Sequence, residues 1–140
     1  LINNFELHHQ FNHLVRDYPT NLSKHILNAH ADGGMIPTRQ YFEALDKTTT
    51  LRAQFASLFK KIDVLIMPAT LGEPPRGLGS TGNSIFNGPW TLLGFPVVNL
   101  PLAKGPNGMP LCLQLIGAPH RDLELIECAK QLQTQLHPSE

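Results

Sequence analysis

The sequence predicts an α/β (mixed) fold in which a small mixed sheet of about three strands is packed by helices. Apolar residues recur at helical spacing before about residue 62. Short apolar runs bounded by proline and glycine follow, and a final segment returns to helical spacing. We therefore expect one domain over 1–140, helical at 1–62 and rich in strands and turns at 63–140, with a helix at its end.

Three helices are expected in the first part. Apolar residues at helical spacing predict a first helix that ends before Pro19. A short helix is expected over 23–30, with Gly33 and Gly34 stopping it. A long helix should span 37–61, because the proline at its start suits the first helical turn.

The second part opens with a predicted strand at 63–67, which reads as fully buried because its apolar residues run without alternation. Pro68 ends it, and a loop rich in glycine and proline is expected at 69–82. A helix over 84–93 then ends at Gly94 and leads into the next strand.

The last two strands form a predicted hairpin. One starts at Val97, and a turn at 104–108 places the other, 111–116, antiparallel to it. Asp122 is expected to cap a final helix. Three strands make a thin sheet for the predicted helices, which favours a piece of a larger sheet or a chain that associates.

The bulk composition narrows the function classes. Eleven basic and eleven acidic residues cancel, so charge does not point to nucleic acid or an anionic membrane as a partner. No apolar run approaches the roughly 20 residues that a membrane span needs. The first residue is leucine, which suggests a chain cut from a longer one or without its leader. Cys112 and Cys128 are interpreted as free thiols, with a disulfide as the lesser alternative, and the cytoplasm is the default location.

Several patterns imitate known sites, and each has a plainer explanation. Gly77–Gly82 spells a dinucleotide motif, but it does not follow a strand directly and is better explained as a surface loop. Ser57–Lys60 spells S-x-x-K near a helix end, without the partner motifs. His9 and His13 have a zinc-compatible spacing but lack a third ligand nearby, so no metal or cofactor is expected. Arg52 could anchor a carboxylate, although a structural role is favoured.

One cluster remains as a candidate substrate-binding site. On a helix, Phe86 and Trp90 would share a face, as would Asn87 and Thr91. An aromatic pair beside an amide and a hydroxyl would make a suitable pocket wall. The alternative is ordinary core packing, with Asn87 as a cap.

These segments, taken in order, resemble the closing segment of the amidase signature family of serine amide hydrolases. The resemblance covers most of the chain and is strongest from Asp63 to Ala129. It rests on pieces that are weak alone but specific together: Asp63-Val64-Leu65, Pro68-Ala69-Thr70, Phe86-Asn87, Trp90-Thr91-Leu92-Leu93-Gly94, Pro96, Pro101, Gly108-Met109-Pro110 and Gln114-Leu115-Ile116-Gly117.

The resemblance implies a large mixed sheet layered with helices and an acyl-enzyme mechanism that uses two serines and a lysine. No Gly/Ser-rich segment of that kind occurs here, so no catalytic residue is assigned. The chain is expected to be the C-terminal portion of an amidase that is inactive alone and supplies scaffold and a wall for a small amide substrate. Its expected partner is the upstream part of the enzyme. The alternative is a non-catalytic binding or assembly module that self-associates through its exposed sheet, and a nucleotide-binding protein is a distant third.

Overall fold

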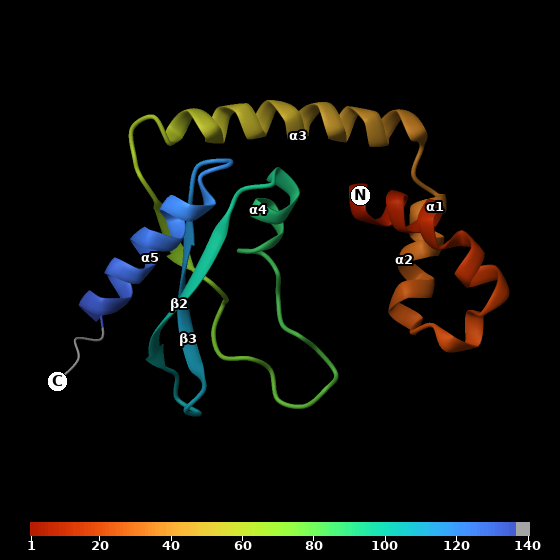
Figure 1. The fold of residues 1–140 in the computed structure, drawn as a ribbon. Helices are drawn as coiled ribbons and strands as arrows, with labels where there is room; N and C mark the ends of the chain where they lie inside the picture. Colours follow the sequence, from red (N-terminus) through yellow and green to blue (C-terminus); the bar gives the residue numbers. More distant parts are fainter. Residues whose placement is uncertain (137–140) are drawn as a thin grey trace. The chain divides into compact units, whose positions relative to one another are not determined.

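The computed structural model describes residues 1–136, and the chain forms two compact units, Leu1–Thr50 and Leu51–Glu140. Helices make up the first unit, whereas the second carries the sheet (Figure 1). The composition changes near residue 62, but the boundary between the units lies earlier, within helix α3 (Thr38–Leu58). The last turns of α3 therefore group with the sheet.

The first unit consists of α1 (Ile2–Asp17), a 3₁₀ turn at Pro19–Asn21, α2 (Lys24–Gly34) and the start of α3. The first helix ends before the proline, as the sequence predicts. Ser23 caps α2, since its Oγ accepts a hydrogen bond from the backbone N–H of Ile26 at 3.4 Å. Helices α1 and α2 pack on one another.

The short helix continues past the predicted residue 30 and ends at Gly34, so both glycines belong to its last turn. Gly33 also marks the point where α2 approaches α1. A Cβ atom at this position would overlap the backbone carbonyl of Asn4 and lie 2.8 Å from Cβ of His8. Glycine is therefore needed here for close helix packing.

The second unit is built on a sheet of β1 (Leu65–Pro68), β2 (Val97–Lys104) and β3 (Pro110–Ile116), in the order β1-β3-β2. β2 and β3 form the predicted antiparallel hairpin, and β1 pairs with the other edge of β3. Helices with a three-stranded sheet confirm the predicted α/β class. Both pairings are antiparallel and not of mixed direction, because β1 and β2 run the same way but flank β3 without pairing with each other.

Three further predicted boundaries differ by a few residues. β1 begins at Leu65 and not at 63, because its ladder starts opposite Ile116, where β3 ends. α3 ends at Leu58 and not at 61, because the chain continues as turns after Leu58. α4 (Gly88–Leu93) starts later than the predicted 84, because the backbone N–H of Gly88 donates to the carbonyl of Ser84 at 2.7 Å and closes a turn there.

Each face of the sheet carries an apolar cluster, because alternate strand residues point to opposite faces. α4 and the end of α3 pack on one face, and α5 (Asp122–Leu136) packs on the other (Figure 1). Ile116 and Leu115 of β3 are both fully buried, one in each cluster. The cluster beside α4 comprises Trp90, Leu93, Phe95 and Ile116, and the cluster beside α5 comprises Leu100, Leu115, Leu125 and Ala129.

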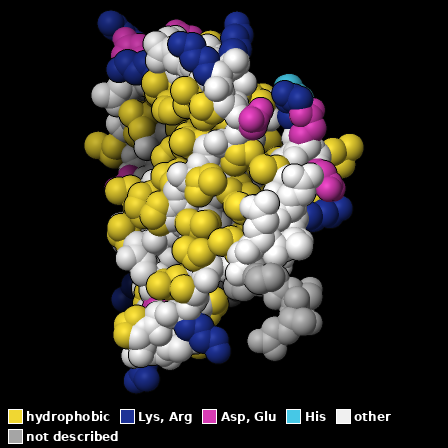
Figure 2. Space-filling view, turned by 90° about the vertical axis from the view of Figure 1, so that its left-hand side faces the viewer, with side chains coloured by type: hydrophobic (Ala, Val, Ile, Leu, Met, Phe, Trp, Pro, Cys, Tyr) yellow, Lys and Arg dark blue, Asp and Glu magenta, His cyan; other side chains and the backbone are white. Residues whose placement is uncertain are grey.

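The side of the second unit that carries α5 also exposes apolar side chains, and Figure 2 shows hydrophobic groups gathered there. Ile66 of β1 lies opposite Leu115, so it shares the α5 face of the sheet, yet its exposed fraction is 50%. Leu123 and Ile126 of α5 are also exposed. The described residues therefore leave this face partly uncovered.

Candidate functional site

A cavity of about 660 Å³ lies wholly within the second unit, on the α4 side of the sheet. It is bounded by the chain that follows β1, by the approach to α4, and by β2 and β3. Its lining combines apolar residues, glycines and polar side chains. The polar and thiol-bearing lining residues are Thr70, Glu73, Thr81, Asn83, Ser84, Asn87, Asn99 and Cys112.

The sheet supplies Asn99 from β2 and Cys112 from β3. Asn99 lies opposite Gln114, and Cys112 lies opposite Pro101, two positions further along the same ladder. Residues two apart on a strand share a face, so both side chains belong to the α4 side. Cys112 is a free, half-buried thiol, and so is Cys128, as interpreted from the sequence.

Asn87 connects the start of α4 to Ala69, which follows β1 in the lining of the cavity. Its Nδ2 donates to the carbonyl oxygen of Ala69 at 3.2 Å, and the backbone N–H of Ala69 donates to the carbonyl of Cys112 at 3.0 Å. Ala69 is only 4% exposed, so this contact point is buried. Within residues 1–136, Oδ1 of Asn87 makes no hydrogen bond and is free to accept one from a ligand.

Glu73 fixes the loop that follows β1 to the turn of the hairpin. Its carboxylate accepts hydrogen bonds from the backbone N–H of Asn107 at 2.9 Å, from Nδ2 of Asn107 at 2.5 Å, and from the backbone N–H of Met109 at 3.0 Å. Burial acts to raise the pKa of Glu73, but these hydrogen bonds outweigh it, and the pKa lies below its ordinary value. Glu73 is therefore ionised at neutral pH and holds one rim of the cavity in place.

Only one of the four residues proposed from the sequence, Asn87, lines this cavity. Trp90 is 6% exposed in the core cluster, where its Nε1 donates to Sδ of Met67 at 3.1 Å. Phe86 is half-buried in the turn before α4, and Thr91 is exposed, with its Oγ1 donating to the carbonyl of Asn87 at 3.1 Å. The helix that would align all four begins too late, at the residue after Asn87.

Gln114 was not singled out from the sequence, although it is the only buried polar residue of the described chain, residues 1–136, with a fully covered side chain. Its Nε2 donates to the carbonyl of Phe86 at 2.9 Å and so anchors the turn before α4 to β3. Its Oε1 has no hydrogen-bond partner among the described residues. The available signal was a single glutamine within an otherwise apolar strand.

Asn99 and Glu73 were likewise missed. A polar residue inside the strand that begins at Val97 and a single acid in a segment of prolines and glycines were the available signals. Neither could be interpreted without the pairing of β2 with β3, which brings distant segments together.

The sequence patterns that imitate known sites have plainer roles in the structure, as expected from the sequence. Nε of Arg52 donates to the carbonyl oxygen of Leu93 at 2.6 Å and satisfies the end of α4, beside Gly94, whose φ is 67°. Ser57 lies at the end of α3 and donates to the carbonyl of Gln54 at 2.7 Å. No helix begins on Gly77–Gly82.

The histidines of the first unit also make local contacts. Nδ1 of His9 donates to the carbonyl of Phe5 at 2.9 Å, four residues earlier in α1. Among residues 1–136, no three His, Cys, Asp or Glu side chains are grouped as a metal site would require. No helix in this part of the chain is both long enough and apolar enough to cross a membrane.

The sequence matches the model of the amidase family over residues 9–126. One component of the glutamyl-tRNA(Gln) amidotransferase of Wolbachia sp. subsp. Drosophila simulans (strain wRi) is 29% identical over 103 residues, which are 66% of this chain and 21% of that protein. A putative amidase, AmiA2, of Mycobacterium tuberculosis is 33% identical over 89 residues, which are 55% of this chain and 18% of that protein. The chain thus spans about a fifth of the length of these curated relatives.

Solved structures agree on the fold. A crystal structure of an amidase superposes with a TM-score of 0.80 at 24% identity, over 94% of this chain and 33% of that one. A 6-aminohexanoate cyclic dimer hydrolase superposes with a TM-score of 0.73 at 18% identity, over 96% of this chain and 33% of that one. Because the family model matches most of the sequence and the fold agrees, this chain belongs to the amidase family.

Proposed function

We propose that this chain is the C-terminal portion of an amidase that hydrolyses carbon–nitrogen (amide) bonds, and that it supplies scaffold and one wall of the substrate pocket. The observation that carries the proposal is the cavity of about 660 Å³, lined by amide and hydroxyl groups and supported by fully buried residues of β3. Binding sites for small molecules are concave and mostly apolar, with a few fixed polar groups. Membership of the amidase family supplies the class of substrate.

In this proposal the chain contributes no nucleophile. An activated serine or cysteine needs a base within hydrogen-bond reach and donors for the oxyanion. Ser84 and Cys112 carry the only serine hydroxyl and thiol in the described lining, which contains no lysine or histidine. Within residues 1–136, neither side chain makes a hydrogen bond to a base. The nucleophile and its base would come from the remainder of the enzyme.

Asn87 is the residue that we propose contacts the substrate, through its free Oδ1. Trp90 acts from behind the wall, since its burial in the core fixes α4 against the sheet. Phe86 would act through its carbonyl, which Gln114 holds, and Thr91 through its hydrogen bond to the backbone of Asn87. The wall is thus a supported surface and not a set of four side chains pointing inward.

The partner that we propose is the upstream part of the amidase. The curated relatives are about five times as long as the segments that they share with this chain, so a larger polypeptide accompanies this segment in them. Exposed Ile66 and its apolar neighbours on the α5 side would be covered by that polypeptide.

The test compares the purified chain alone with the chain mixed with an upstream amidase polypeptide. We expect no amide hydrolysis and no adduct with a serine-directed fluorophosphonate from the chain alone, and activity only in the mixture. Asn87→Leu should lower the activity of the mixture, whereas Asn28→Leu, at an exposed position of α2, should not. A stoichiometric adduct on the isolated chain would show that it carries its own nucleophile and would refute the proposal.

A second candidate is a non-catalytic assembly module that self-associates through the exposed α5 side. The exposure of Ile66 at 50% favours it, because a stable single chain rarely leaves a sheet face uncovered. Solution mass separates the two candidates. A defined oligomer that Ile66→Lys converts to a monomer supports the module, whereas a monomer that binds the upstream polypeptide supports the enzyme portion.

A further inference from the structure

The chain between β1 and α4, residues 69–87, supplies most of the lining of the cavity and contains no helix or strand. The sheet supplies only Asn99, Pro110 and Cys112. Loops longer than about 12–15 residues are uncommon in compact domains, and many of those that occur are lids or binding loops. The contacts that hold this loop in place therefore control access to the cavity.

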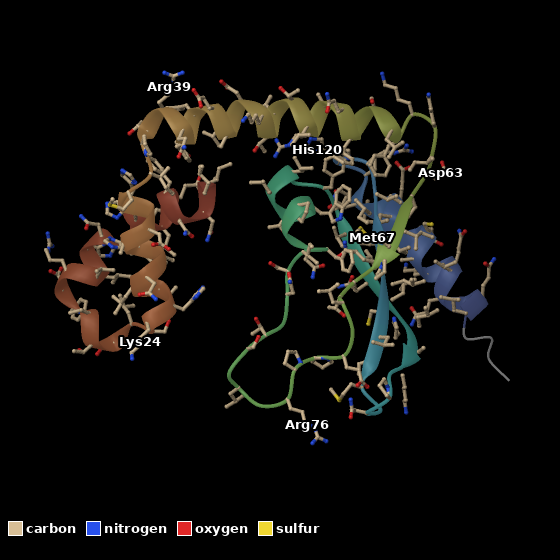
Figure 3. All side chains as sticks on the ribbon, turned by 180° about the vertical axis from the view of Figure 1, so that it is seen from behind. Lys24, Arg39, Asp63, Met67, Arg76 and His120 are labelled. Carbon is tan, nitrogen blue, oxygen red and sulfur yellow. The ribbon has the colours of Figure 1, made fainter. Side chains whose placement is uncertain are left out.

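Apolar burial does not hold the central part of this loop, residues 70–82, which we call the cover segment. Every residue of the cover segment is exposed except Glu73, which is half-buried. Its two leucines, Leu71 and Leu78, are among the most exposed apolar side chains of the described chain. Arg76, near the middle of the segment, points away from the sheet (Figure 3).

Hydrogen bonds attach the cover segment to the rest of the second unit at one residue. Two of its hydrogen bonds are internal: Oγ1 of Thr70 donates to the carbonyl of Gly72 at 2.7 Å, and the backbone N–H of Gly82 donates to Oγ of Ser80 at 3.1 Å. Within residues 1–136, every hydrogen bond that leaves the segment is accepted by the carboxylate of Glu73. Burial and hydrogen bonding thus single out the same side chain.

The turn between β2 and β3 is shaped to receive this carboxylate. The backbone N–H groups of Asn107 and Met109 donate to Glu73 at 2.9 and 3.0 Å. A Cβ atom at Gly105 would lie 2.5 Å from Cδ and Oε1 of Glu73, so the absence of a side chain at Gly105 leaves the space that the carboxylate occupies. The backbone N–H of Gly105 also donates to the carbonyl of Met109 at 2.8 Å and closes the turn.

We infer that the cover segment is a lid that opens and closes over the cavity, and that Glu73 is the latch that holds the lid closed on the β2–β3 turn. When the latch is broken, residues 70–82 stay attached only at their two ends and can move as a unit. Gly82, whose φ is 95°, lies at one of these ends. The inference goes beyond the proposed function, because it concerns access to the cavity and holds for any ligand that the cavity takes.

The two free cysteines report on the lid in the 140-residue chain. Cys112 lines the cavity on its sheet side, whereas Cys128 lies in α5, outside that lining. Iodoacetamide alkylates both thiols, and mass spectrometry follows the rate at each one. Glu73→Ala should raise the rate at Cys112 by at least about tenfold, as expected from the loss of hydrogen bonds to a charged group, and should leave the rate at Cys128 unchanged.

A second substitution breaks the latch from the side of the turn. Gly105→Ala keeps Glu73 but places a methyl group where its carboxylate lies, so it should also raise the rate at Cys112. Gly79→Ala is the matched control, because a Cβ atom there has nothing within 4 Å. In the Glu73→Ala background, Gly105→Ala should have no further effect, because the contact that it disturbs is already absent.

Three outcomes would overturn the inference. An unchanged rate at Cys112 in Glu73→Ala would show that Glu73 does not hold the cavity closed. Equal increases at Cys112 and Cys128 would show that the substitution loosens the whole unit and not the lid alone. A wild-type Cys112 that reacts as fast as it does in the urea-unfolded chain would show that the segment does not cover the cavity.

Discussion

Different kinds of contact stabilise the interior of each of the two units. In the second unit, large apolar side chains such as Leu115 and Ile116 are fully removed from solvent. In the first unit, α1 has no buried residue, and α2 buries only Ala29 and Gly33. Apolar burial therefore stabilises the second unit, whereas the first depends on the fit between helix backbones and on polar and aromatic contacts.

The contacts of the first unit are specific but small. The rings of Phe5 and Tyr41 stack with centroids 4.2 Å apart, and the hydroxyl of Tyr41 donates to Glu6 at 2.9 Å. The ring of His8 lies 4.3 Å from that of His30, and Nδ1 of His8 donates to the carbonyl of His30 at 2.9 Å. Substitutions that remove volume should harm the second unit most, and substitutions that add volume should harm the first.

The largest expected effect is that of Leu115→Ala. Leu115 is 0% exposed, so the substitution should lower the free energy of unfolding of the second unit by about 2–5 kcal/mol. Leu123→Ala is the matched control, because Leu123 is 82% exposed and should change stability by less than about 0.5 kcal/mol. Urea denaturation followed through the fluorescence of Trp90, the single tryptophan, measures both. Equal effects of the two substitutions would contradict burial as the main source of stability here.

Gly33→Ala should have the next largest effect, in the first unit. Its methyl group would overlap the backbone of Asn4, which cannot move without displacing α1, so a loss of about 1–3 kcal/mol is expected despite the better helix propensity of alanine. Gly34→Ala is the comparator, since a Cβ atom there would meet only ring atoms of His8. Hydrogen exchange of α1 and α2 amides reports on this unit separately. A smaller loss of protection in Gly33→Ala than in Gly34→Ala would show that the two helices do not depend on this close approach.

The sequence predicted the type and order of the helices and strands because each carries a local signal. The spacing of apolar residues and the positions of glycine and proline located the hairpin, the final helix and the helix end at Gly94. Errors and omissions arose where distant chain segments or local turns decide the outcome. The close approach of Gly33 to Asn4 has no local signal, and the start of α4 is set by a turn that closes at Ser84.

The candidate site was less predictable for the same reason. Asn87 was found because it lies in a recognisable local cluster. Asn99 and Glu73 join it only through the strand register and through hydrogen bonds across 34 positions of sequence. Trp90 has the residue type of a pocket wall, yet it packs in the core because its neighbours Leu93 and Phe95 close around it.

The pH dependence of the two units should also differ, beginning with the first. Burial is the main cause that lowers the pKa of His30 below its ordinary 6.5; the charge of His8 lowers this pKa as well, and a smaller backbone interaction with His8 opposes the shift. Well above pH 6.5, His30 is neutral in both the folded and the unfolded state, and its protonation does not reduce the stability of the first unit. As the pH falls below 6.5, the unfolded chain takes up the proton first, so the first unit loses stability. Hydrogen exchange of α2 should show this loss, and His30→Gln should remove it. A wild-type profile that is flat through this range would contradict the assignment.

The smallest expected effect concerns the hydrogen bonds of Glu73 in the second unit. These hydrogen bonds should persist to a lower pH than the one at which the first unit begins to lose stability. The pKa of Glu73 is below its ordinary 4.5, so its hydrogen bonds to Asn107 and Met109 are fully present above that value and are lost as the pH falls below it. The backbone amide shifts of both residues should therefore titrate below pH 4.5, and Glu73→Gln should abolish the titration without changing the unfolding of the sheet. Glu124→Gln, at an exposed acid of α5 paired with Arg121, is the matched control and should leave these shifts unchanged. The backbone amides of Asn107 and Met109 could instead titrate above pH 4.5, or titrate equally in Glu73→Gln. Either result would show that a group other than Glu73 determines the pH dependence of this contact. A single side chain would then account for acid sensitivity in the first unit only.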